Sequence, residues 1–173
     1  MSELKRAVEW DNIAGNTTAL RHIDDDLPQL YFSLIEEERE ELLAAIYALD
    51  RVEVLDALGD LLKVVSGAVS ALGYCPEKLL QLVNDSNYSK FCVTKEQAVI
   101  SVAAYEQNLR YEDVYYEQVG DLYIIRGYEK GGDKVGKGKI LKGYAYAEPD
   151  IKQYHWELYG DVDVVKSSND GSA

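Results

Sequence analysis

The sequence predicts a mainly α fold: a bundle of four to five helices followed by a small C-terminal β-hairpin segment. Two long stretches, 27–49 and 51–72, carry apolar residues at the helical period. After residue 107 the composition changes to segments rich in tyrosine, isoleucine and valine that glycine interrupts, which is typical of strands and turns. Together these patterns indicate a helical core with a β-containing extension.

The first elements follow from local signals. Residues 2–10 favour a short helix, whereas 12–24 contain glycine, asparagine and threonine and are loop-like. Three aspartates then precede Pro28, which is typical of an N-cap region with proline in the first turn. A long helix is therefore predicted over 27–49.

Capping signals also delimit the later helices. Asp50 can cap a helix over 51–72, and Gly73 is a typical residue just after a helix end. Proline at the first position starts a helix over 76–89, and a capping box starts one over 94–107.

The C-terminal part of the sequence is predicted to contain strands. Segments 115–119 and 122–126 flank Gly120 and indicate a β-hairpin, and 139–142 is a candidate third strand. The aromatic stretch 144–165 fits no element clearly.

Composition restricts the function classes. The net charge is −13, from 18 basic and 31 acidic residues, which argues against binding a nucleic-acid backbone. No apolar run approaches a membrane span, and the polar N-terminus resembles no secretory signal. Cys75 and Cys92 have no metal-ligand spacing. We therefore expect a cytoplasmic protein with reduced thiols, bound to neither membrane nor nucleic acid.

Two acidic clusters are the most informative feature. Glu37, Glu38 and Glu41 fall within the arc of the first long helix that also holds apolar residues. Glu53, Asp56 and Asp60 share one face of the next helix. Carboxylates within an apolar arc are costly without a positive partner.

A divalent cation would be such a partner. Facing helices could supply about five oxygen ligands, which suits Mg²⁺ or Mn²⁺, and metals held by carboxylates serve phosphate chemistry. Zinc is disfavoured because His22 and His155 are isolated. The alternative, a partly solvated acidic face, stays open at this point. The second cluster continues along its helix as Val64, Gly67, Ala68 and Ala71, which predicts close packing there.

In this order and spacing, the motifs Glu37-Glu38-x-x-Glu41 and Glu53-x-x-Asp56 resemble the all-α nucleoside triphosphate pyrophosphohydrolases. This group includes the MazG proteins, the all-α dimeric dUTPases and the phosphoribosyl-ATP pyrophosphohydrolases. Further likeness lies in 67–74, in Ser86-Asn87-x-x-Lys90 and in 138–150, which resemble the phage-type subgroup. The resemblance spans roughly residues 5–150.

The sequence departs from the pattern in two places. Trp10-Asp11 stands where the subgroup often has a Phe-His pair, which concerns the base-side pocket. The acid pair of MazG-like members would fall on Ala57 and Asp60, whereas here Glu53 and Asp56 form the pair one turn earlier.

The resemblance implies roles for these residues. Glu38 and Glu41 are the expected catalytic residues, with Glu38 a metal ligand or the base that orients the water. Lys90 and Asn87 would bind phosphate or sugar, and Trp10 would stack on the base. The alternatives are purely structural roles: a core position for Trp10, a helix-end cation for Lys90 and a C-cap for Asn87. The expected ligands of Mg²⁺ or Mn²⁺ are Glu37, Glu38, Glu41, Glu53, Asp56 and, as an additional or supporting residue, Asp60.

The implied activity is hydrolysis of a nucleoside triphosphate to the monophosphate and pyrophosphate, an acid-anhydride hydrolase reaction. dUTP or dCTP is the first expectation, and dGTP, GTP or a modified nucleotide is the alternative. A different class is a non-enzymatic acidic helical interaction protein. Relatives assemble as homodimers or homotetramers, and a phage-encoded member would act in the host cytoplasm. The expected organisation is a MazG-like helical catalytic core over 1–92, an extension with a helix and strands over 93–165, and a disordered tail over 166–173.

Overall fold

The chain folds into two compact units, one comprising Met1–Leu80 and Tyr154–Ala173 and the other Gln81–Gln153. The computed structural model describes residues 2–16, 21, 23 and 25–160. The expected tail over 166–173 and part of the predicted 12–24 loop lie outside them. None of the helices in the described residues combines the length and the hydropathy that crossing a membrane requires.

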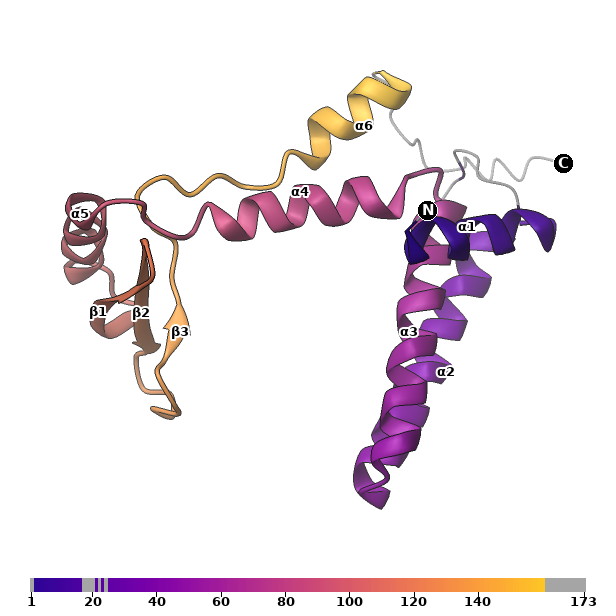
Figure 1. The fold of residues 1–173 in the computed structure, drawn as a ribbon, viewed down its shortest axis with the longest axis horizontal. Helices are drawn as coiled ribbons and strands as arrows, with labels where there is room; N and C mark the ends of the chain where they lie inside the picture. The colour runs from indigo at the N-terminus through magenta and orange to yellow at the C-terminus, as the bar shows by residue number, and fades with distance from the viewer. Residues whose placement is uncertain (1, 17–20, 22, 24, 161–173) are drawn as a thin grey trace, which may run out of the picture. The chain divides into compact units, whose positions relative to one another are not determined.

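A pair of long helices dominates the first unit. α2 (Asp26–Ala48) and α3 (Arg51–Ala71) lie side by side and are joined by a short turn (Figure 1). As predicted, the Asp50 side chain caps α3, because it accepts hydrogen bonds from the backbone amides of Val52 and Glu53. Both long helices expected from periodicity are therefore confirmed, within two residues at each end.

The two helices pack through small side chains. A Cβ atom built on Gly67 would lie 2.1 Å from Cε1 of Tyr31, so only glycine permits this approach. Tyr31 and Ala68 are core residues of this unit, and Ala71 is buried with them. The close packing that the small residues of α3 predicted is thus present, and it is directed at α2.

The large apolar side chains of α3 lie on another face. This face is exposed in the chain, with Leu55 at 65%, Leu62 at 69% and Val52 at 73% of their full accessibility. Leu58 and Val65 are exposed as well. We refer to these five residues as the apolar stripe. The periodicity that predicted the helix is therefore not the pattern that fills the core of this unit.

Two shorter helices complete the first unit. α1 (Glu3–Ile13) continues three residues beyond the predicted end at residue 10. α6 (Ile151–Tyr159) lies in the stretch that the sequence left unassigned. Tyr154 and Tyr159 of α6 pack against Tyr74 at centroid distances of 5.7 and 5.8 Å, so aromatic contacts hold this helix.

The second unit combines helix and sheet. Its antiparallel sheet has the order β1-β2-β3, and the predicted hairpin is confirmed by the pairing of β1 with β2. Its core contains Cys92, Ala98, Ile125 and Leu141. The bounds of its elements, including a helix that begins in the first unit, are α4 (Pro76–Tyr88), α5 (Lys95–Glu106), β1 (Tyr111–Val119), β2 (Leu122–Glu129) and β3 (Lys139–Ile140).

Candidate functional site

Glu38 is the centre of the acidic cluster. It lies on α2, and its Oε2 atom is buried without a hydrogen-bond partner among the described residues. Glu37 and Glu41, on either side of it along the helix, are exposed. A buried carboxylate oxygen that nothing satisfies is costly, so Glu38 is the residue of this cluster that most needs a positive partner.

Carboxylates from both long helices act on Glu38. Its pKa is raised, first by burial and then by the charges of Asp60, Glu41, Glu37 and Asp56. We refer to Glu38 and these four residues together as the acidic group. Among these four charges, that of Asp60 raises the pKa of Glu38 the most. The sequence analysis had expected Asp60 only as an additional or supporting ligand, behind Glu53 and Asp56.

Glu53 does not belong to the acidic group. It lies exposed in the first turn of α3, where a negative charge suits the helix N-terminus. As the side chains stand, no three histidine, cysteine or acidic residues in the described part of the chain converge closely enough to hold a metal ion.

The donor set of the acidic group nevertheless fits a hard cation. All of its candidate ligands are carboxylate oxygens, which Mg²⁺ prefers, and one of them is buried and unpaired. Glu37, Glu41 and Asp56 are exposed, so rotation of their side chains can change the distances within the group.

A pocket of about 470 Å³ lies next to the acidic group. It is lined by residues of α1, α2 and α3, among them Trp10, Leu34 and Lys63. Lys63 follows Asp60 by three residues and Leu34 precedes Glu38 by four, so on each helix the pocket and the acidic group are about one turn apart. We call it the Trp10 pocket.

Trp10 is one of the residues that line this pocket. It is 60% exposed, so the alternative that it is a core residue is wrong. The Nζ atom of Lys63 lies 4.5 Å from the centroid of its ring, a cation–π distance. An exposed indole beside a pocket is able to stack on a planar ligand.

Asp11 and Lys63 form an ion pair inside the pocket. Asp11 is only 1% exposed, and Lys63 Nζ donates to its Oδ1 over 2.6 Å. Its Oδ2 is buried and accepts no hydrogen bond of ordinary geometry from the described residues. Burial, and then the interaction with Asp11, raises the pKa of Tyr31 to about 12.

Sequence reasoning missed Lys63 and Tyr31, and it noted Asp11 only as a departure from the Phe-His pair. The predicted first helix ended at residue 10 and the predicted loop began at residue 12, so Asp11 was assigned to neither. No local signal links positions 11 and 63, which only the packing of α1 on α3 brings together.

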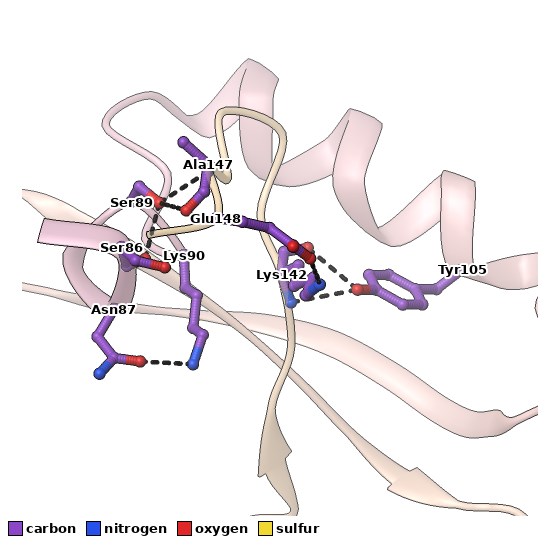
Figure 2. Close-up of polar contacts among 8 residues, drawn as sticks. All are labelled: Ser86, Asn87, Ser89, Lys90, Tyr105, Lys142, Ala147 and Glu148. Atoms are coloured by element: carbon purple, nitrogen blue, oxygen red, sulfur yellow. Dashed lines mark hydrogen bonds and ion pairs between the residues drawn. The ribbon is translucent and has the colours of Figure 1, made fainter. Parts of the chain in front are cut away.

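The predicted phosphate-binding residues lie in the second unit (Figure 2). Lys90 Nζ donates to Oδ1 of Asn87 over 2.7 Å, just beyond the end of α4. The Asn87 side chain is thus engaged with Lys90. A lysine amine has further protons to donate, so this pair can still bind an anion.

Neighbouring contacts fix the backbone of this segment. Ser89 Oγ donates to the carbonyl of Ser86 over 2.7 Å and accepts from the amide of Ala147 over 2.9 Å. The amide of Gly143 donates to the carbonyl of Lys90 over 3.0 Å. Segment 86–90 is therefore held against segment 143–147 within the second unit.

Residues 17–87 match the family model of phosphoribosyl-ATP pyrophosphohydrolase. That family is a member of the all-α nucleoside triphosphate pyrophosphohydrolase superfamily. The resemblance expected from the acidic motifs is thereby confirmed, and the superfamily supports a hydrolase that acts on acid anhydrides. The phage-type subgroup stays a prediction.

The matched segment contains the complete acidic group, Glu53 and Asn87. It leaves out Lys90 and the Trp10-Asp11 pair. The pocket therefore combines α2 and α3 residues of the matched segment with α1 residues outside it. No curated protein matches the chain.

Proposed function

We propose that the protein is a metal-dependent nucleoside triphosphate pyrophosphohydrolase that produces a nucleoside monophosphate and pyrophosphate. The observation that carries the proposal is the buried, unpaired oxygen of Glu38 among four further carboxylates. This arrangement lies within the segment that matches a pyrophosphohydrolase family. A group of this kind is poorly suited to open water and well suited to cations that accompany a triphosphate.

The acidic group would hold Mg²⁺ or Mn²⁺, with Glu53 as a further candidate ligand. Such a cation would supply neutralisation of phosphate charge and would favour deprotonation of the attacking water. Glu38 or Glu41 would orient that water and take up its proton. The oxygen of this water would form a bond to the α-phosphorus while the bond from the α-phosphorus to the bridging oxygen breaks, so that pyrophosphate leaves.

The remaining predicted residues would bind the substrate. Trp10 would stack on the base. Lys90 would contact a phosphate as a point charge, and Asn87 would donate hydrogen bonds from its amide. With a net charge of −13, local cations are needed to attract a triphosphate.

A substrate panel tests the proposal. The purified chain with Mg²⁺ is incubated with dUTP, dCTP, dGTP, GTP and the remaining common nucleotides, and the products are separated by anion exchange. Monophosphate and pyrophosphate in equal amounts are expected, with dUTP and dCTP or dGTP and GTP as the preferred pair. Release of orthophosphate alone would contradict the proposal. A non-enzymatic acidic interaction protein would neither turn over nucleotides nor bind them in a Mg²⁺-dependent manner in calorimetry.

We further propose that the protein acts in the cytoplasm as a homodimer or homotetramer. The apolar stripe of α3 supports this assembly, since Val52, Leu55 and Leu62 are too exposed for a single chain in water. A second copy would cover the stripe by helix packing.

A further inference from the structure

Lys63 of α3 contacts two consecutive residues of α1. Its Nζ atom donates to Oδ1 of Asp11 over 2.6 Å, and it lies 4.5 Å from the centroid of the Trp10 ring. The first contact is an ion pair, and the second is a cation–π contact. A single lysine therefore links a buried carboxylate to an exposed aromatic ring.

Asp11 fixes the position of the lysine amine. Only 2% of the Asp11 side chain is exposed, and the Tyr31 hydroxyl of α2 interacts with the same carboxylate. Separating a buried ion pair is costly, because it leaves a buried charge without compensation. The position of Nζ is therefore set by Asp11 and not by the weaker contact with Trp10.

The Trp10 side chain, in contrast, extends into solvent. It is 60% exposed, and exposed side chains exchange rotamers within nanoseconds unless a contact holds them. A side chain that is ordered only when a ligand binds lowers the affinity for that ligand. Because Nζ of Lys63 lies over one face of the indole, the other face stays open to a planar ligand.

Resting on the proposed function, we infer that Lys63 is a positioning residue, whose anchored amine holds the Trp10 indole in place to stack on the nucleotide base. We call Trp10, Asp11 and Lys63 the Lys63 clamp. The clamp orders the indole before the base arrives, so binding costs less conformational entropy. Aromatic stacking accepts every base. The clamp should therefore strengthen the binding of nucleotides in general, but not of a ligand that lacks a base.

A direct contact between Lys63 and a phosphate is the competing role. Lys63 follows Asp60 of the acidic group by three residues, about one helical turn, and a lysine can bind phosphate as a point charge. The described contacts of its amine are to α1, which favours the clamp. The two roles also differ in their ligands, because a phosphate contact would act on any polyphosphate and would not depend on Trp10.

Calorimetry with Mg²⁺ separates these roles without turnover. The probes are dUTP and dGTP analogues with an imido bridge between the α and β phosphates, and tripolyphosphate as a ligand without a base. Lys63→Met should weaken both analogues roughly 2- to 10-fold, through the lost cation–π contact and the ordering of the indole, and leave tripolyphosphate unchanged. Lys63→Arg should stay within about twofold of wild type, since a guanidinium also pairs with carboxylates and stacks on aromatic rings. Lys78→Met removes an exposed lysine of α4 and should change neither ligand.

A double-mutant cycle shows whether Lys63 acts through Trp10. In a Trp10→Leu background, Lys63→Met should change analogue binding by less than about twofold. In pyrophosphate release, Lys63→Met should raise KM and leave kcat unchanged, because stacking on the base is the same in the ground state and the transition state. Equal weakening of tripolyphosphate and the analogues would overturn the inference, as would an undiminished effect of Lys63→Met in Trp10→Leu.

Fluorescence tests the clamp without nucleotide and without a change at Lys63. The chain has two tryptophans, so Trp156→Phe leaves Trp10 as the only one. Time-resolved anisotropy of this variant should show an indole without fast independent motion, and Lys63→Met should introduce that motion. A freely moving indole in Trp156→Phe would overturn the inference even if Lys63→Met does not fold, and intact analogue binding would then leave the proposed function standing. A held indole in a protein that binds neither analogue would instead contradict the proposed function, and with it the role of the clamp in binding.

Discussion

Gly67→Ala should destabilise the first unit, because Gly67 of α3 lies directly against the ring of Tyr31 on α2. The added Cβ would lie 2.1 Å from Cε1 of Tyr31, about 1.5 Å inside an ordinary carbon–carbon contact. Overpacking of this severity costs about 3 kcal/mol, and the better helix propensity of alanine returns about 1 kcal/mol. The net loss is about 2 kcal/mol, or a fall in Tm of roughly 4–8 °C.

Gly59→Ala on the same helix is the matched control. A Cβ built on Gly59 has no neighbour within 4 Å, so only the propensity gain of up to about 1 kcal/mol should remain. Urea unfolding followed by helical circular dichroism measures both variants. If Gly67→Ala is as stable as Gly59→Ala, the account of the α2–α3 packing is wrong.

Three further results are expected. Because burial and neighbouring carboxylates raise the pKa of Glu38, the folded state binds that proton more tightly than the unfolded state. The free energy of unfolding in EDTA should therefore fall as pH rises from about 4.5 through the raised pKa. Glu38→Gln should flatten this profile in urea titrations, and a profile parallel to wild type would refute the assignment. Asp50→Ala removes the cap of α3 and should cost about 1 kcal/mol in the same assay, whereas an unchanged midpoint would contradict the capping role. Leu62→Glu in the apolar stripe should dissociate the assembly in light scattering, while an unchanged mass would show that the stripe is not the interface.

The helical core could be predicted because its signals are local. The caps at Asp50 and Thr94 and the glycine after α3 are each readable within a few residues, and the helices begin and end close to them. α6 could not be predicted in this way. Its aromatic residues are held by contacts such as that between Tyr154 and Tyr74, which lie far apart in the sequence.

The sequence indicated only in part which face of α3 packs against α2. Its apolar stripe has the stronger helical periodicity, yet the chain buries Gly67, Ala68 and Ala71 against α2. Small residues contribute little apolar area but permit close approach of the backbones. Large exposed residues on the other face indicate a partner, which a single sequence does not identify.

The candidate site, too, could be predicted from the sequence only in part. The acidic group follows from helical spacing within α2 and α3, and the structure adds the burial of Glu38 and the prominence of Asp60. The pair formed by Asp11 and Lys63 depends on the packing of a separate helix. Since neither residue stands in a motif, only the three-dimensional structure brings them together.

The most direct test of the central claim is pyrophosphate release by carboxylate variants of α2 and α3. With Mg²⁺ and the preferred nucleotide, Glu41→Gln and Asp56→Asn should each abolish release while keeping the wild-type circular dichroism. Glu40→Gln changes an exposed neighbour outside the acidic group and should retain activity. Full activity in Glu41→Gln and Asp56→Asn, or equal loss in all three variants, would contradict the account.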